Sequence, residues 1–198
     1  MIEIWKNKIE LLAYQTTKDG NTECGDSYYY IATDEYFICV LADGLGSGKY
    51  ANESSVAVVE TVEQYHHKDV DTIMDLCNRA LFHKRGAAVS VLKVFFSRRK
   101  FEYSAVGNIR FFLYSPDGKL TYPLPVTGFL SGKPQVFHTQ QYSYEPESKF
   151  LLYSDGFDIH GVKALLSSFK STQLIGDELK RDFKNTGDDA TFILGSLL

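Results

Sequence analysis

The order in which strand-like and helix-like segments follow one another constrains the fold of this chain more than any other feature. Alternating and apolar runs bounded by turn residues indicate strands at 9–16, 27–33, 36–41, 87–96, 101–106, 109–114, 120–122, 136–144, 150–153 and 190–194. Helical patterns at 51–65 and 70–81 follow the third strand, and two more, at 162–169 and 172–183, precede the last one. This order lacks the βαβ alternation of a parallel sheet. We therefore expect an α+β fold in which helices cover two antiparallel sheets, with a single domain over residues 1–198.

Three short segments place an aspartate at one end of an apolar run. They are Val40–Gly44, Leu151–Gly156 and Gly187–Thr191. A run of this kind can place a carboxylate at the edge of a buried sheet, and several such carboxylates can surround one cation. Aspartate oxygens suit Mg²⁺ or Mn²⁺, so the three segments predict a site for a hard divalent ion.

The dipeptide Asp-Gly is also a strong hairpin signal, and this alternative applies to each segment taken singly. Asp117-Gly118 links two strand-like segments, and Asp19-Gly20 lies in a polar stretch, so both are interpreted as ordinary turns. Asp43-Gly44 and Asp155-Gly156 differ because each leads toward a helical pattern without a matching return strand. Gly25-Asp26-Ser27 offers a further carboxylate, with an Asx turn as the alternative.

The loop Gly44–Gly48 lies between a strand and a helix, where a nucleotide-binding loop could lie. Its G-x-G-x-G pattern places Lys49 where a dinucleotide fingerprint needs a third glycine, and the chain contains no G-x-x-x-x-G-K-[ST] sequence. A nucleotide site is therefore disfavoured. Gly44 has another use, since a residue without a Cβ allows its own carbonyl to approach a metal.

Composition and charge exclude several classes of function. A formal net charge of −4 over 198 residues gives no general attraction to nucleic acid or anionic membranes. Three cysteines without C-x-x-C spacing indicate neither a disulfide framework nor a zinc site. Apolar stretches such as Tyr36–Ala42 are far too short to span a bilayer. We expect a cytoplasmic protein, monomeric, with no nucleic-acid or membrane partner.

Taken in order, these segments resemble the metal-dependent PP2C-type protein phosphatases over essentially the whole chain. The resemblance rests on Gly25-Asp26, Ala42-Asp43-Gly44-Leu45-Gly46, Ser104–Arg110, Ser154-Asp155-Gly156 and Asp188-Asp189-Ala190-Thr191. Within that family the chain is most similar to a small phosphoserine phosphatase that resets the bacterial stressosome. The resemblance implies a four-layer αββα sandwich with the active site in a cleft at one end of the paired sheets.

The resemblance also implies roles for individual residues. Asp43 would bridge two Mn²⁺ or Mg²⁺ ions, the Gly44 carbonyl would bind one of them, and Asp155 and Asp188 would complete the catalytic set. Asp26 would bind directly or through a metal-bound water. Asp189 and Asn108 would lie behind these ligands and support them.

This chain departs from the family pattern around the phosphate. The family commonly has Glu where this chain has Gly25, and an upstream phosphate-binding Arg that residues 20–24 lack. Arg85 and Lys49, each close in sequence to a site segment, are the candidates for phosphate contacts. The expected function is hydrolysis of phosphoserine or phosphothreonine on signalling partners, with phosphorylated stressosome scaffold proteins implied by the resemblance. The alternative is a catalytically weak module that keeps the fold and binds a signalling partner.

Overall fold

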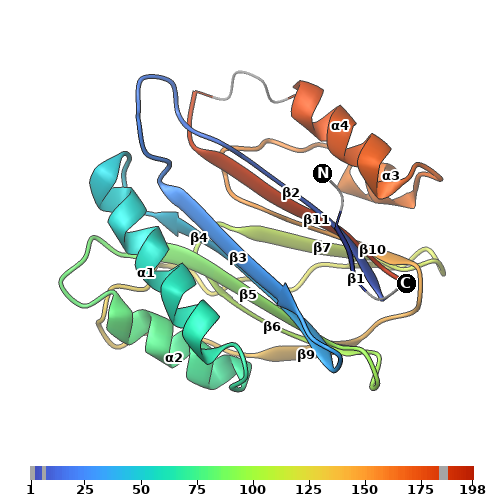
Figure 1. Ribbon diagram of the computed structural model, residues 1–198, viewed down its shortest axis with the longest axis horizontal. Helices are drawn as coiled ribbons and strands as arrows, with labels where there is room; N and C mark the ends of the chain where they lie inside the picture. The colour runs from blue at the N-terminus through green and yellow to red at the C-terminus, as the bar shows by residue number, and fades with distance from the viewer. Residues whose placement is uncertain (1–2, 6–7, 183–186) are drawn as a thin grey trace.

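The computed structural model describes residues 3–5, 8–182 and 187–198, and it contains two antiparallel sheets packed face to face (Figure 1). The strands are β1 (Glu3–Trp5), β2 (Ile9–Thr16), β3 (Asp26–Ala32), β4 (Tyr36–Gly44), β5 (Ala87–Phe95), β6 (Lys100–Val106), β7 (Arg110–Tyr114), β8 (Leu120–Thr121), β9 (Gln140–Ser143), β10 (Ser148–Tyr153) and β11 (Ala190–Leu197). The helices are α1 (Lys49–Tyr65), α2 (Val70–Ala80), α3 (Val162–Ser167) and α4 (Thr172–Asp182). One sheet has the order β1-β2-β11-β10-β7-β8 and the other β3-β4-β5-β6-β9.

The central strands have apolar side chains on both faces because both faces are covered. In β4, Phe37, Cys39 and Leu41 pack into the core between the sheets. The intervening Ile38 and Val40 pack outward against α1 and α2. A strand buried on both faces has a continuous apolar run in place of strict alternation. This explains why the sequence around Val40 shows no polar face.

Each sheet carries one pair of helices on its outer face (Figure 1). Val58 and Ile73 bring α1 and α2 onto the five-stranded sheet. Leu166 and Ile175 bring α3 and α4 onto the six-stranded sheet, where they contact Leu151 and its neighbours. The predicted four-layer αββα arrangement is therefore confirmed. No helix in the described part of the chain is long and apolar enough to cross a membrane.

One lysine from each sheet holds the turn between the two helices that cover that sheet. Lys93 of β5 is 3% exposed, and its Nζ donates to the carbonyl oxygens of His66 at 2.8 Å and Lys68 at 2.6 Å. Lys149 of β10 donates to the carbonyls of Ser168 and Lys170, both at 2.8 Å. Carbonyl oxygens at a helix end have no partner within the helix, so these ammonium groups satisfy them.

The structure differs from the predicted elements in several places, and three differences are instructive. The strand expected at 136–144 is only β9, Gln140–Ser143, because the residues before it follow an irregular path anchored to other elements. The three-residue β1 was not predicted, because it is too short to show a periodicity. The last strand extends to Leu197 and pairs along its full length with β2. Phe183, which the sequence assigns to the last helix, lies outside the described residues.

Replacing Lys93 with Met tests the turn-holding role. We expect a loss of about 2 kcal/mol in the free energy of unfolding, because hydrogen bonds to charged groups contribute roughly 1.5–3 kcal/mol each and water can reach part of the turn. Urea unfolding measures the loss. Lys100→Met, at an exposed lysine of the adjacent strand, is the matched control and should change stability by less than about 0.5 kcal/mol. Equal losses in the two variants would contradict the role.

Candidate active site

At one end of the sandwich, polar side chains replace the apolar core between the sheets. The alternation that points Cys39 and Leu41 of β4 into this space continues to Asp43. Asp26 of β3 lies directly opposite Asp43 in the antiparallel register, so both carboxylates face the same way. Two acidic groups thus lie where the other end of the sheet places leucine and phenylalanine.

Ser154 joins the two sheets at this point. It follows β10, and its Oγ donates to Asp26 Oδ2 at 2.6 Å. The same Oγ accepts a hydrogen bond from the backbone N–H of Thr191 at 3.0 Å, and the Ser154 N–H donates to the Thr191 carbonyl at 3.0 Å. Gln15 of β2 adds a second connection, because its Nε2 donates to the Asp26 carbonyl at 3.0 Å and to Thr191 Oγ1 at 3.2 Å.

The structure gathers the predicted carboxylates around a small hollow of about 180 Å³. Its lining comprises Asp43, Gly44, Leu45, Gly46, Asn108, Asp155, Asp188 and Asp189. Asn108, in the turn after β6, donates from Nδ2 to Asp155 Oδ2 at 2.6 Å and so orients that carboxylate. Six of the predicted site residues line this hollow, and Asp26 lies behind it, 2% exposed.

Lys18 organises the acidic segment that precedes β11. Its backbone N–H donates to Asp189 Oδ1 at 2.9 Å, and its Nζ forms an ion pair with Asp188 Oδ1 at 3.5 Å. Asp189 is buried, whereas the side chain of Asp188 is 54% exposed. Asp188 therefore faces the open side of the hollow, and Asp189 supports the chain beneath it.

Two glycines permit the close approach of backbones at the site. A Cβ on Gly44 would lie 1.9 Å from the Ala51 carbonyl oxygen, so only glycine lets the end of β4 pack against the first turn of α1. A Cβ on Gly25 would lie 2.8 Å from Asp189 Oδ2. A larger residue at position 25, such as the family's Glu, would therefore displace the Asp189 carboxylate from its present place.

The clustered carboxylates raise one another's proton affinity. Burial, together with the charges of Asp26, Asp155, Asp188 and Asp189, raises the pKa of Asp43 to about 8. Burial also raises the pKa of Asp26 to about 6, and the hydrogen bond from Ser154 partly offsets that rise. Without a compensating cation, this end of the sandwich is an electrostatically unfavourable cluster.

The donor set fits a hard divalent cation. Asp26 Oδ1 is buried and accepts no hydrogen bond from the part of the chain that the structure describes. Among the same residues no three His, Cys, Asp or Glu side chains converge on one ion position. Mg²⁺ is commonly bound by one or two carboxylates and several waters, so a complete protein cage is not required. The available ligands here are all oxygens.

The two predicted phosphate contacts have different surroundings. Arg85 lies against the loop after β4, since a Cβ on Gly46 would be 2.7 Å from Arg85 Nη1. Its guanidinium also lies over the Tyr50 ring, 4.9 Å from the centroid. Lys49 lies at the start of α1, where its exposed Nζ is 4.0 Å from Glu53 Oε1. Neither residue lines the hollow, but Arg85 lies against Gly46, which does. The geometry favours Arg85 over Lys49.

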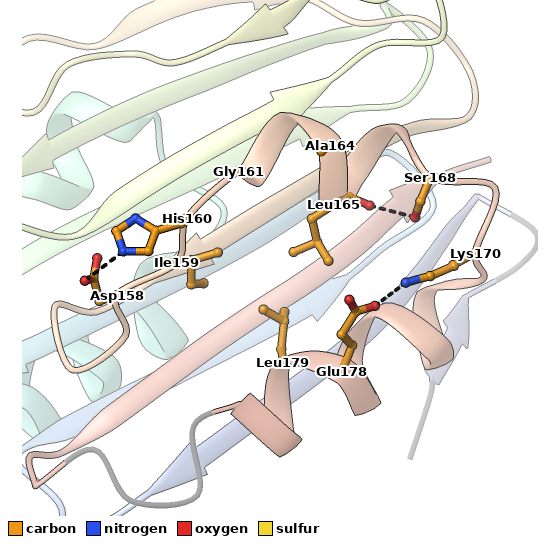
Figure 2. Close-up of a pocket in the computed structure, with 10 residues that line it drawn as sticks. All are labelled: Asp158, Ile159, His160, Gly161, Ala164, Leu165, Ser168, Lys170, Glu178 and Leu179. Carbon is orange, nitrogen blue, oxygen red and sulfur yellow. Dashed lines mark hydrogen bonds and ion pairs between the residues drawn. The ribbon is translucent and has the colours of Figure 1, made fainter.

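A larger hollow, of about 540 Å³, lies at α3 and α4, away from the carboxylates (Figure 2). Its charged groups pair with each other: His160 Nε2 is 3.3 Å from Asp158 Oδ2, and Lys170 pairs with Glu178. Leu165 and Leu179 point into it from the two helices (Figure 2). It shares no lining residue with the carboxylate site and contributes nothing to its chemistry.

Sequence reasoning missed the roles of Ser154 and Lys18. Ser154 directly follows β10 and directly precedes Asp155, and a hydroxyl next to a predicted metal ligand is the signal that could have identified it. Lys18 carries no local signal, since it is 170 residues from its partner Asp188. Asp117 is in the expected turn, with its Oδ1 accepting from the Lys119 N–H at 3.0 Å.

The fold and the acidic end of the sandwich define a PP2C-type phosphatase. A family model described as Stage II sporulation protein E (SpoIIE) matches residues 33–195. The phosphoserine phosphatase RsbX of Bacillus subtilis (strain 168) is 46% identical over 198 residues, which is 100% of this chain and 100% of RsbX. The chain therefore belongs to the SpoIIE family of PP2C-type phosphatases and is a homologue of RsbX.

Solved structures agree with this assignment. A crystal structure of RsbX in complex with magnesium has a TM-score of 0.96 at 44% identity and covers 100% of this chain and 99% of that chain. The PP2C phosphatase domain of SpoIIE from Bacillus subtilis, solved with a fragment of its regulatory domain, has a TM-score of 0.80 at 15% identity, covering 96% of this chain and 63% of that one. The catalytic domain of PstP, in complex with 2 manganese ions, has a TM-score of 0.74 at 16% identity, with coverages of 96% and 99%. The last two likenesses show the shared fold.

We predict that Asp43→Asn stabilises the protein in EDTA at pH 8. The folded state holds a proton on Asp43 between its ordinary pKa of 3.8 and about 8, so this group's contribution to stability is present at low pH and is lost as the pH rises through that window. The amide carries no charge and should make stability less dependent on pH. Thermal melts give the stability of each protein at pH 5 and at pH 8. Between these two pH values wild type should lose at least about 1 kcal/mol more stability than the variant, the equivalent of roughly one pKa unit. Parallel pH profiles would refute the prediction.

Proposed function

We propose that this protein hydrolyses phosphoserine or phosphothreonine on partner proteins with the help of two bound Mn²⁺ or Mg²⁺ ions. The observation that carries the proposal is that Asp43, Asp155 and Asp188 line one hollow, with Asp26 buried behind it. A surface turn does not require four carboxylates brought together from β3, β4, the segment after β10 and the segment before β11. Their retention also disfavours the alternative of a binding module without turnover.

The ions would be held by Asp43, the Gly44 carbonyl, Asp155 and Asp188, with Asp26 binding directly or through water. Bound divalent ions in such a site activate a water for attack and neutralise charge on the phosphate. Asp43, which burial and its acidic neighbours bring to a pKa of about 8, is the group most affected when positive charge arrives. Its deprotonated form would then be favoured at neutral pH.

The remaining residues hold these ligands and the phosphate in place. Asn108 fixes one oxygen of Asp155 at 2.6 Å, and Ser154 fixes one oxygen of Asp26 at the same distance. Arg85, whose guanidinium lies against Gly46 of the lining, is the cation that we assign to contact a phosphate oxygen. These residues supply orientation, which contributes to rate by avoiding the entropic cost of alignment.

The 46% sequence identity to RsbX, which extends along the whole chain, supports a particular substrate class. We place the protein in negative feedback on the general stress (sigma-B) pathway, where phosphorylated stressosome scaffold proteins would be its substrates. A cytoplasmic, monomeric enzyme fits that task. The net charge of −4 fits a protein partner better than nucleic acid.

The activity assay follows phosphate release from a phosphoserine protein with Mn²⁺, with Mg²⁺ and with EDTA. Asp43→Asn and Asp155→Asn should each lower kcat by at least about 100-fold, because a carboxylate that holds the activating ion has no substitute. Asp117→Asn, at the turn between β7 and β8, is the matched control and should keep full activity. Turnover by wild type in EDTA, or by Asp43→Asn at the wild-type rate, would rule out the proposal.

Ser154→Ala tests whether the connection between the sheets orients Asp26. Removing a group that hydrogen-bonds a metal ligand typically lowers metal affinity or activity by about 10–100-fold, and we expect a loss in this range. The melting temperature, measured at rising Mn²⁺ concentrations, reports the metal affinity. Ser104→Ala is the control, since Ser104 is fully buried and its Oγ has no hydrogen-bond partner among the described residues. An unchanged Mn²⁺ affinity in Ser154→Ala would remove Ser154 from the site.

A further inference from the structure

A second hollow, of about 330 Å³, adjoins the carboxylate hollow. It is lined by Leu45, Ala88, Gly107, Asn108, Thr127, Gly128 and Phe129. Two of these residues, Leu45 and Asn108, also line the carboxylate hollow, so the two spaces share a wall. A molecule seated in one of them therefore extends naturally into the other.

The adjoining hollow differs in character from its neighbour. None of its lining residues is charged, whereas four of the eight residues around the first hollow are aspartates. Its outer wall is the segment 127–129, where Phe129 leaves 44% of its surface exposed. Its position beside a concave, uncharged surface that adjoins the carboxylate hollow makes this ring available to a ligand bound across the two hollows.

The segment that carries Phe129 is held firmly on both sides. Val126 exchanges backbone hydrogen bonds with Ala105 and Gly107 at 2.9 Å and 2.8 Å, and Leu130 exchanges two with Ala87 at 3.0 Å and 2.9 Å. The segment is thus pinned immediately before and immediately after the residues that line the hollow.

Asn78 of α2 fixes the residues that directly follow this segment. Its Oδ1 accepts from the N–H groups of Ser131 and Gly132 at 3.1 Å and 3.0 Å, and its Nδ2 donates to the Lys133 carbonyl at 2.8 Å. The Phe129 ring itself rests on the chain at Gly86, where a Cβ would lie 2.9 Å from its Cδ2. A wall fixed in this way needs little ordering when a ligand binds, which lowers the entropic cost of binding.

We propose that the hollow formed by Leu45, Ala88 and Phe129 is a recognition subsite for the residue that flanks the phosphoserine of the substrate protein, and that it selects an uncharged apolar side chain. This inference rests on the proposed function. An extended peptide advances about 3.3 Å per residue, so a residue one or two positions from the phosphoserine reaches the adjoining space. A charged side chain there would lose water without gaining a partner, and an acidic one would also meet the neighbouring aspartates.

Such a subsite would make turnover depend on contacts with a protein substrate. Residues 20–24 contain no arginine that could clamp the phosphate, and Arg85 lies at the rim. Binding free energy from contacts remote from the reacting group can be used to orient that group. Phe129 and Leu45 would supply such contacts, and a small phosphoester such as p-nitrophenyl phosphate would lack them.

The test compares phosphoserine peptides that carry Leu, Glu or Lys at each position from two before to two after the phosphoserine, assayed with Mn²⁺. Wild type should prefer Leu over Glu by about 10-fold in kcat/KM at one flanking position. Phe129→Ala should lower kcat/KM for the preferred peptide about 10-fold, chiefly through KM, and should lower it much less for p-nitrophenyl phosphate. Phe169→Ala, at a fully exposed phenylalanine near the distant α3–α4 pair, is the matched control and should change neither value.

A charge introduced at the wall supplies an independent readout. Thr127 is exposed, and Thr127→Lys should raise kcat/KM for the Glu peptide relative to the Leu peptide at that same flanking position. The subsite is overturned if wild type shows no flanking preference, if Phe129→Ala affects peptide and p-nitrophenyl phosphate equally, or if Thr127→Lys leaves the Glu-to-Leu ratio unchanged. Failure of wild type to hydrolyse any of these phosphoesters is a different result, which would overturn the proposed function itself.

Discussion

The hydrogen bond from Ser154 Oγ to Asp26 Oδ2 connects the two sheets at the end where their apolar contact stops. Along the rest of the interface, phenylalanine and leucine side chains hold the layers together. At this end the layers must be held by polar groups, because carboxylates occupy the inward-facing positions of β3 and β4. Ser154, just after β10, and Gln15, in β2, perform this task. The relative position of Asp26, in β3, and Asp155, which follows β10 of the other sheet, depends on these bonds.

The cost of burying carboxylates explains why the site lies at a sheet end. A charged group in the middle of the sandwich would be desolvated on all sides, whereas Asp43, at the end of β4, faces a hollow that solvent ions can enter. Its pKa of about 8 shows that even here the ionised form is disfavoured until a cation compensates it. Folding therefore proceeds against this local repulsion, and the large apolar core between and outside the sheets supplies the stability that permits it.

The sequence predicted the elements whose signals are local. Strand β2 and helix α2 have the predicted limits to within one residue, since runs of alternating or helical spacing identify them directly. The carboxylates were predictable because each stands beside Gly at the limit of an apolar run, whereas Ser154 and Lys18 act through contacts distant in sequence. The path of residues 123–139 was not predictable either. It depends on Asn78, a helical residue whose amide replaces the partners that a strand would have provided.

Asn108 belongs to both the carboxylate hollow and the uncharged hollow beside it, because it lines each of them. Its side-chain amide also donates a hydrogen bond to Asp155. The turn that carries it is compact: a Cβ on Gly107 would lie 2.4 Å from the Ala88 Cβ, and the Gly107 N–H donates to Val126 at 2.8 Å. The backbone that presents the flanking wall is thus bonded directly to the backbone that presents the Asp155 partner. The uncharged hollow and the Asp155 carboxylate therefore share Asn108 as a common wall and hydrogen-bond donor, held by one compact turn.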